Sequence, residues 1–223
     1  MMKKHLTWLG FILLIPSLLF NFFLYQKIQN TPSSGILVIE VLDGDTLLLD
    51  GKERLRLRQV DAPELSFCGG EQAKKLMIDL AKGKRVVIKE QILDQYGRPM
   101  ALIYQDGKLL NLKILASGWA RYHADQTTQA GILKEAAGKA KEEGKGIFSS
   151  LCYQTENLQK PECLIKGNVD KNSTARKYYF PGCAQYEFTI VEKDLGEDWF
   201  CTEKEAQKAG FTRAETCRNK TYH

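Results

Sequence analysis

Two Asp-Gly pairs divide the segment from Ile36 to Val60 into three short apolar runs, and this punctuation constrains the fold more than any other feature. Asp-Gly between apolar runs is a strong signal for a tight β-hairpin turn. In the third run, arginines alternate with leucines from Arg54 to Arg58, which gives one apolar and one basic face at the period of a strand. The segment therefore predicts an antiparallel meander of three strands.

The residues after the meander first change to a helical period. Apolar side chains recur at i, i+3, i+4, i+7 and i+8 within residues 69–82, and Gly83 is a typical residue to follow the end of a helix. The chain then returns to strand-forming sequence at 85–91 and 100–104, with a loop at 94–99 between them.

Two more helices are expected before residue 150. We predict that Asn111 is the N-cap of the first, which ends at Gly118, and that the second spans residues 130–143. Five mostly antiparallel strands with three helices predict an α+β domain over residues 35–150. A five-stranded β-barrel of the OB type is the natural way to close such a sheet.

The N-terminal segment over residues 6–26 is apolar on every face and about long enough to cross a bilayer as a helix. No small-residue cleavage site precedes Lys27, which favours a retained transmembrane anchor over a cleaved signal peptide. Two lysines before the segment outnumber Lys27 after it, so we expect residues 1–5 in the cytoplasm and the rest of the chain outside it. Residues 27–34 are expected to be a linker.

Six cysteines fit a chain exported from the cytoplasm, where disulfides persist. Five of them follow residue 150, so we expect a small Cys-rich module over residues 176–223, after a linker or loop at 151–175. The sequence does not determine the pairing, because six cysteines allow fifteen connectivities. The six are Cys68, Cys152, Cys163, Cys183, Cys201 and Cys217.

The composition is that of a folded chain with a modest basic excess. Of 223 residues, 43% are hydrophobic, which argues against disorder. The net charge is +5, from 32 Lys+Arg against 27 Asp+Glu, and residues 1–150 carry all of it, with 21 basic and 16 acidic residues. This balance permits an anionic partner such as a nucleic acid without demonstrating one.

Acidic and basic residues recur in three predicted loops, in a fixed order. They are Asp43-Gly44-Asp45-Thr46, then Arg56-x4-Asp61-Ala62-Pro63-Glu64, then Asp94-x-Tyr96-Gly97-Arg98. Taken singly, each is an ordinary turn sequence. Together, and followed by Glu143-Gly-Lys-Gly-Ile-Phe148, they resemble the staphylococcal nuclease (thermonuclease) family over residues 36–149.

The resemblance implies a site for one Ca²⁺ ion. Asp45 and Asp61 would be its carboxylate ligands, and the backbone carbonyl of Ala62 would be a third. Carboxylate and carbonyl oxygens select hard cations such as Ca²⁺ or Mg²⁺. Two carboxylates leave positions open for water and substrate, so a loose site suited to millimolar Ca²⁺ is expected. No organic cofactor is expected.

The resemblance also implies a hydrolytic site for phosphodiesters. Arg56 and Arg98 would grip the scissile phosphate, where negative charge develops in the transition state. Glu64 would be the general base or would orient the attacking water. Tyr96 would contact a substrate phosphate. The implied activity is Ca²⁺-dependent cleavage of DNA and RNA to 3′-phosphate ends.

Some positions depart from the family pattern or leave alternatives open. Gln95 stands where a lysine is expected, which removes one phosphate contact. Tyr122 is the candidate for stacking on a substrate base, with His123 as an alternative, although a partly buried tyrosine is the more ordinary role for Tyr122. Arg54 and Arg58 either solvate the strand face or add phosphate affinity.

The Cys-rich module expected over residues 176–223 is similar to the zinc-binding domain of the Ada repair protein. A zinc site there needs four thiolates, and Ala214 occupies the position of one of them. The remaining Cys183, Cys201 and Cys217 therefore favour disulfides, with Zn²⁺ as the alternative.

Two functions remain open at this stage. The first is a membrane-tethered, Ca²⁺-dependent nuclease that acts as a monomer on DNA and RNA. The second is a non-catalytic OB-type module that binds nucleic acid. The five charged residues expected in the site discriminate between them, because a degenerate copy is expected to lack some of them. All five are present: Asp45, Arg56, Asp61, Glu64 and Arg98.

Overall fold

The structure, a computed structural model, describes residues 17, 20–22, 35–171 and 173–222. The chain divides into two units, Met1–Ser34 and Gly35–His223. The expected anchor over residues 6–26, with its flanking segments, lies outside the described residues except for positions 17 and 20–22. Within the described ranges, no helix is both long enough and apolar enough to span a bilayer.

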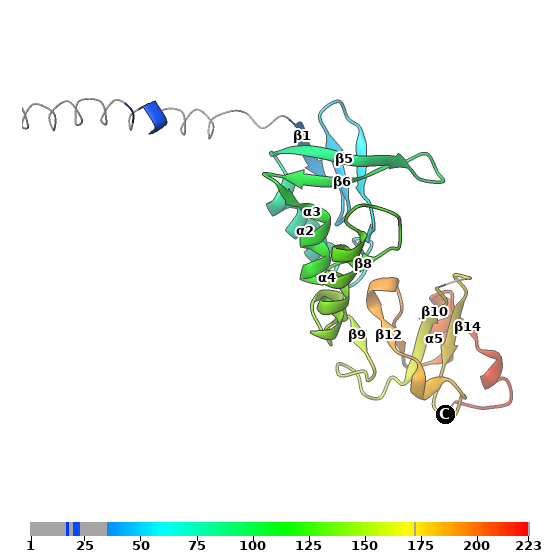
Figure 1. Cartoon of the computed structure of the whole chain (residues 1–223). Coiled ribbons are helices and arrows are strands. Elements are labelled where there is room, and N and C mark those ends of the chain that lie inside the picture. Colours follow the sequence, from blue (N-terminus) through cyan, green and yellow to red (C-terminus); the bar gives the residue numbers. More distant parts are fainter. Residues whose placement is uncertain (1–16, 18–19, 23–34, 172, 223) are drawn as a thin grey trace, which may run out of the picture. The chain divides into compact units, whose positions relative to one another are not determined.

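The first part of the larger unit is a closed β-barrel of five strands (Figure 1). They are β1 (Ile36–Val41), β2 (Thr46–Leu49), β3 (Arg54–Leu57), β5 (Arg85–Leu93) and β6 (Pro99–Gln105). The order is β3-β2-β1-β5-β6, and a parallel pairing of β3 with β6, in which Leu57 faces Ala101, closes the barrel. A short strand, β7 (Lys108–Leu109), continues β6 as a hairpin. The predicted five-stranded OB-type barrel is confirmed.

The alternation along β3 explains how this strand is oriented. Leu55 and Leu57 are fully buried in the barrel core, whereas Arg54 is exposed and Arg56 is half-buried. The third predicted strand, which was expected to continue to Val60, is interrupted because Gln59 adopts a positive φ of 62°. The chain turns there and resumes as β4 (Val60–Asp61), which pairs with β8 (Arg121–Tyr122) outside the barrel.

Three helices gather at one end of the barrel (Figure 1). They are α2 (Gly70–Ala81), α3 (Leu110–Ser117) and α4 (Ala130–Glu142), followed by a 3₁₀ turn, η1 (Gly146–Phe148). In α2 the buried side chains Ala73, Met77 and Ala81 recur every four residues, as predicted. All three helices contribute to one hydrophobic core with the barrel strands.

The expected N-cap role of Asn111 is wrong. Leu109 is the N-cap of α3, and Asn111 lies inside the helix with 0% of its surface exposed. Its side-chain oxygen accepts from the Ile103 N–H at 3.0 Å, and its side-chain nitrogen donates to the carbonyls of Arg58 and Ala101 at 2.8 and 3.2 Å. Asn111 therefore joins the helix to the end of β3 and the middle of β6.

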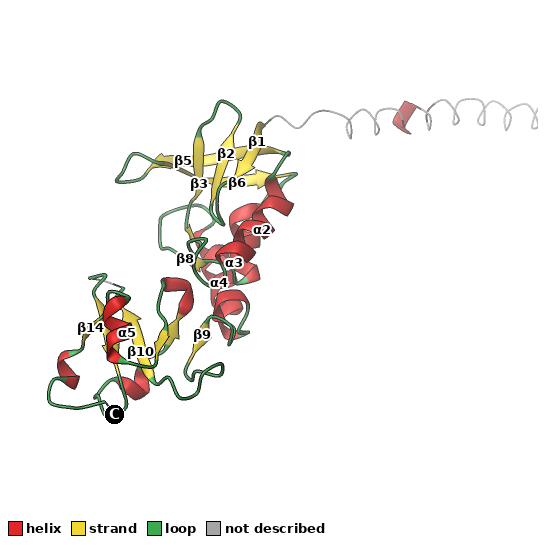
Figure 2. Ribbon diagram, turned by 180° about the vertical axis from the view of Figure 1, so that it is seen from behind, coloured by secondary structure: helices red, strands yellow, loops and turns green. Residues whose placement is uncertain are grey.

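The second part of the larger unit has its own small core and sheet (Figure 2). The sheet order is β13-β10-β11-β14, with α5 packed against β10 and β13. Its elements are β10 (Ile165–Val169), β11 (Arg176–Tyr179), β13 (Trp199–Phe200), α5 (Glu203–Lys208) and β14 (Thr212–Arg213). Thr202 and Glu205 form the capping box at the start of α5. Shorter elements are β9 (Tyr153–Gln154), η2 (Tyr186–Phe188), β12 (Val191–Glu192), η3 (Lys193–Leu195) and η4 (Glu215–Cys217).

The segment expected as a linker, 151–175, differs in the structure. It contains β9, which pairs with β12, and β10, which lies between β11 and β13 in the four-stranded sheet. Residues 151–175 show no sustained apolar periodicity, and their two strands pair with strands that lie later in the chain. We refer to residues 151–222 as the C-terminal module.

The six cysteines form three disulfides: Cys68–Cys152, Cys163–Cys201 and Cys183–Cys217. Two of them lie within the C-terminal module, and Cys68–Cys152 links the module to the part of the chain that forms the barrel. The set Cys183, Cys201 and Cys217 is therefore divided between two bridges. No thiol is left in the described part of the chain to bind zinc.

Candidate active site

Asp45 is held in a rigid position in the turn between β1 and β2. It is 1% exposed, and its carboxylate accepts from the Thr46 hydroxyl at 2.9 Å and from the Ala62 N–H at 2.8 Å. Gly44 makes this packing possible, since a Cβ at position 44 would lie 2.5–2.6 Å from the Cβ atoms of Ala73 and Ala62. The glycine that signals a turn in the sequence is thus also required for close approach.

Arg56 connects the two predicted metal-binding carboxylates. Its Nη2 atom lies 2.8 Å from Asp45 Oδ2 and 2.9 Å from Asp61 Oδ1. Asp45 is buried, whereas the Asp61 side chain is 58% exposed. The three charged groups come from the β1–β2 turn, β3 and β4, so the barrel brings together residues that two separate motifs supply.

Burial raises the pKa of Asp45 to about 7, against the opposing attraction of Arg56. The nearby Asp43 carboxylate acts in the same direction as burial. An acidic site of this kind favours additional positive charge, because a cation stabilises the ionised form of a buried carboxylate.

The third motif forms a tight loop between β5 and β6, organised by Asp94. The Asp94 carboxylate accepts from the main-chain N–H groups of Tyr96 and Arg98, each at 2.8 Å, and from Arg98 Nε at 2.6 Å. The loop presents Tyr96, 73% exposed, and the Arg98 side chain, 56% exposed. The Arg98 guanidinium lies 5.2 Å from the centre of the Tyr96 ring.

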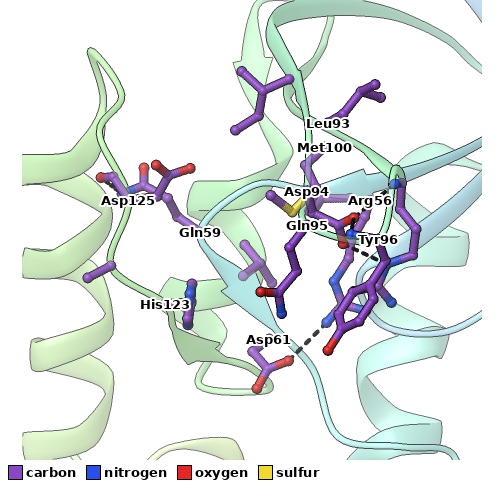
Figure 3. Close-up of a pocket in the computed structure, with 15 residues that line it drawn as sticks. Arg56, Gln59, Asp61, Leu93, Asp94, Gln95, Tyr96, Met100, His123 and Asp125 are labelled. Atoms are coloured by element: carbon purple, nitrogen blue, oxygen red, sulfur yellow. Dashed lines mark hydrogen bonds and ion pairs between the residues drawn. The ribbon is translucent and has the colours of Figure 1, made fainter.

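These elements line a cleft of about 670 Å³ (Figure 3). Arg56, Asp61, Tyr96 and Arg98 are all among its lining residues. Gln95 extends from the loop toward Asp61, and His123 faces the cleft from the other side, after β8 (Figure 3). The structure thus brings together guanidinium, carboxylate and aromatic groups around one open space.

Glu64, the predicted general base, lies on the exposed segment between β4 and α2. It is not among the residues that line the cleft. Within the ranges that the structure describes, its side chain forms no hydrogen bond or ion pair. Its backbone is tightly enclosed, because a Cβ at Gly70 would lie 2.2 Å from the Glu64 carbonyl oxygen.

Tyr122, the candidate for base stacking, is half-buried in β8 against the barrel core. Its hydroxyl accepts from the side-chain nitrogen of Gln59 at 3.1 Å. The neighbouring His123, not Tyr122, is among the residues that line the cleft.

Arg58 is neither a solvated residue nor a phosphate contact, the two roles considered from the sequence. It is 7% exposed, and its guanidinium is bound by Asp125 and by the main-chain oxygens of Glu90 and Gln126. Asp125 and Gln59 also line the cleft, and the sequence motifs did not single out either. The positive φ of Gln59 was not signalled by its residue type.

The residues predicted to hold Ca²⁺ fit a hard cation by their chemistry. Asp45 and Asp61 supply only carboxylate oxygen, and Oδ2 of Asp61 has no hydrogen-bond partner among the described residues. Three or more His, Cys, Asp or Glu side chains do not converge as a metal cluster anywhere in the described ranges. An ion bound between Asp45 and Asp61 would therefore need water or substrate oxygens to complete its coordination.

Comparison with known proteins places the second and third motifs inside a family match. Residues 54–150 match the family described as "Staphylococcal nuclease homologue". The chain is 32% identical over 116 residues to an uncharacterized endonuclease of Haemophilus influenzae, a match that spans 50% of this chain and 65% of the relative. It is 31% identical over 116 residues to an uncharacterized endonuclease of Escherichia coli O157:H7, covering 50% of this chain and 75% of that protein.

A plant relative matches over a similar length of the chain. The protein named "Probable staphylococcal-like nuclease CAN1", from Oryza sativa subsp. japonica, is 31% identical over 103 residues, or 46% of this chain and 31% of its own length. The chain thus spans between about a third and three quarters of these relatives. With the closed barrel and the three motifs in place, these matches show that the chain belongs to the staphylococcal nuclease homologue family.

Proposed function

We propose that this protein is a Ca²⁺-dependent endonuclease that hydrolyses phosphodiester bonds of DNA and RNA and leaves 3′-phosphate ends. The observation that carries the proposal is the position of Arg56. One guanidinium nitrogen contacts both Asp45 and Asp61, at the edge of a cleft that Arg98 and Tyr96 also line. Guanidinium groups beside paired carboxylates are the groups that phosphodiester hydrolysis requires.

Each guanidinium has a distinct part in binding the scissile phosphate. Arg56 is fixed by two carboxylates, so it presents its charge with little loss of side-chain entropy on binding. Arg98 is oriented by Asp94 but stays exposed, so it is free to meet the phosphate from the loop side. Guanidinium groups suit this task better than ammonium groups, because they bind two phosphate oxygens at once.

Glu64 is the proposed proton acceptor for the attacking water. Its exposed position keeps its carboxylate hydrated, so substrate binding must bring the water and this side chain together. Tyr96 is proposed to contact an adjacent phosphate. A Ca²⁺ ion held by Asp45, Asp61 and the Ala62 carbonyl would supply a Lewis acid at the phosphate and neutralise developing charge.

We propose that the enzyme acts outside the cytoplasm, tethered by its N-terminal segment. Three disulfides support this location, because cytosolic thiol systems keep such bridges reduced. Protease added to intact cells should remove the disulfide-bonded unit if it lies outside the membrane. Protection of that unit in intact cells, together with cleavage after lysis, would place it inside.

The function is tested by incubating the purified full chain in detergent with denatured DNA. We expect cleavage with millimolar Ca²⁺, no cleavage with EGTA, and fragments that accept a 5′-label without prior phosphatase treatment. The variant Glu64→Gln should lower kcat by at least about 100-fold, which is typical for loss of a general base. Glu71→Gln, a nearby acidic residue in the first turn of α2, is the matched control and should keep parental activity.

A lack of cleavage in this assay would favour a binding function over a catalytic one. If the parent binds denatured DNA but cleaves none in Ca²⁺, the chain is a nucleic-acid-binding module of the same fold. Cleavage that persists in EGTA would instead reject the Ca²⁺ requirement alone.

A further inference from the structure

The C-terminal module contacts the segment between β4 and α2 through η3. The Cys68 N–H donates to the Lys193 carbonyl at 3.4 Å. The Phe67 ring packs on Gly196, where a Cβ would lie 2.6 Å from the ring and where φ is +75°. Glycine is needed at this position for both its conformation and the space it leaves.

A covalent bond lies beside this contact. Cys68 is bonded to Cys152, and the Cys152 carbonyl accepts from the Lys193 N–H at 2.8 Å. Cys152 is fully buried. The disulfide joins positions 84 residues apart, so it attaches the end of the loop that carries Glu64 directly to the start of the module.

A second attachment lies at the other end of the same segment. Arg121 in β8 faces Asp61 in β4 across their strand pairing. Its side chain forms a two-point contact with Asp194, at 2.6 and 3.0 Å, and a further contact with Glu192 at 3.0 Å. Both acidic residues belong to the module and are buried. Bidentate pairs of this kind are among the strongest in proteins.

Between these two attachments lie Asp61 and Glu64, and Glu64 has no side-chain partner of its own among the described residues. Its position is therefore set by the backbone of residues 60–68. Arg56 and Arg98 lie outside this segment, on β3 and on the β5–β6 loop.

We propose that the C-terminal module is a brace for the catalytic segment 60–68, and that Arg121 and Cys68 are the positioning residues through which it acts. The inference rests on the proposed function for its effect on catalysis. Displacing a catalytic group by about 1 Å costs on the order of 100-fold in rate. Loss of the brace should thus lower kcat and leave KM nearly unchanged, because KM depends on the two phosphate-binding arginines and Arg56 keeps its contact with the buried Asp45, outside this segment.

The test uses the full chain with the double substitution Cys68→Ser and Cys152→Ser. The matched control is Cys183→Ser with Cys217→Ser, which removes a disulfide that lies wholly within the module. We expect the first variant to lose about 10- to 100-fold in kcat with KM within about threefold of the parent. The control should keep parental kcat.

Hydrogen exchange measured in EGTA gives a second readout, independent of activity. Amides of residues 60–69 should exchange faster in the Cys68/Cys152 variant, while those of β5 and β6 keep parental rates. Equal acceleration in all segments, or parental kcat despite faster exchange at 60–69, would overturn the brace. If the parent itself cleaves nothing, the proposed function fails, and exchange alone decides whether the module holds this segment.

The pair Arg121→Lys and Arg121→Met tests the second attachment without altering a disulfide. Lysine keeps the charge but loses the two-point contact with Asp194. We expect kcat to fall in the order parent, lysine, methionine, with KM nearly constant. A rise in KM with unchanged kcat would contradict a positioning role for Arg121.

Discussion

The guanidinium of Arg58 donates to the carboxylate of Asp125, a residue 67 positions further along the chain. Two more of its nitrogens donate to the main-chain oxygens of Glu90 and Gln126, at 3.0 and 2.7 Å. Arg58 therefore ties together the end of β3, the middle of β5 and the loop before α4. That loop forms one wall of the cleft.

Asp125→Asn should destabilise the fold in a pH-dependent way. The hydrogen bond from Arg58 lowers the pKa of Asp125, so the ionised carboxylate stabilises the folded state above the ordinary carboxyl pKa. That contribution is lost as pH falls through the lowered value. We expect the variant to lose about 2 kcal/mol of unfolding free energy at pH 7, measured by urea titration, and less at pH 3, which is below the ordinary carboxyl pKa.

The control for this experiment is Asp79→Asn. Asp79 pairs with Lys75 on the exposed surface of α2, so its loss should cost less than about 0.5 kcal/mol. A difference between parent and Asp125→Asn that is the same at pH 3 and pH 7 would show that the charge of Asp125 does not contribute.

Asn111→Leu should also destabilise the protein, although leucine is close in size. The substitution leaves the Ile103 N–H and the Arg58 carbonyl buried without their partner. Each such group costs about 1–3 kcal/mol, so a loss of about 3 kcal/mol in urea unfolding is expected. Asn219→Leu, at an exposed position, should change stability by less than about 0.5 kcal/mol. Equal losses in the two variants would refute the role given to Asn111.

The barrel was predictable because its strands follow local rules. Leu55 and Leu57 alternate with arginines, and tight turns separate the runs, so each strand's burial is encoded within a few residues. The same holds for α2, whose apolar face repeats every four residues. Where local pattern and burial agree, fold class follows from sequence.

The two arginines that follow Leu55 and Leu57 show where local rules stop. Arg56 and Arg58 have the same spacing and the same chemistry, yet one lines the cleft and the other is buried. The difference comes from Asp125, which lies 67 positions away, and from the turn at the adjacent Gln59, which its residue type does not mark. Long-range pairing of this kind leaves no periodic signal.

The contacts between the C-terminal module and segment 60–68 could not be predicted either, because they also join residues that are far apart in the sequence. Cys68 is isolated among residues of the barrel domain, and no spacing rule identifies Cys152 as its partner. Likewise, Arg121 binds Asp194 across 73 positions. The sequence motifs identified the charged groups of the site, whereas the contacts that hold these groups in place could be recognised only in the folded structure.

Arg98→Ala should reduce activity strongly with little effect on stability. The side chain is mainly exposed, and its structural partner Asp94 keeps its bonds to the loop's N–H groups. Loss of one phosphate-stabilising group typically costs 100- to 1,000-fold, or about 3–4 kcal/mol of transition-state stabilisation. Steady-state cleavage of denatured DNA in Ca²⁺ measures kcat/KM, and urea unfolding measures stability.

Two further variants make the Arg98 result specific. Arg98→Lys keeps the positive charge but cannot bind two phosphate oxygens at once, so its activity should lie between those of Arg98→Ala and the parent. Arg54→Ala removes an exposed arginine on β3 that does not line the cleft, and it should change kcat/KM by less than about threefold. Comparable losses for Arg54→Ala and Arg98→Ala would indicate general charge attraction instead of a defined contact.

Tyr96 should affect substrate binding more than the chemical step. It is exposed at the rim of the cleft, and its ring lies against the Arg98 guanidinium. Tyr96→Phe removes only the hydroxyl, so KM should rise about fivefold, the value of one hydrogen bond, while kcat stays near parental. Tyr96→Ala also removes the ring beside Arg98 and should raise KM further. Tyr153→Phe, in β9 and outside the cleft, is the control. A fall in kcat at constant KM for Tyr96→Phe would instead place the hydroxyl in the reaction itself, because only interactions gained in the transition state change kcat alone.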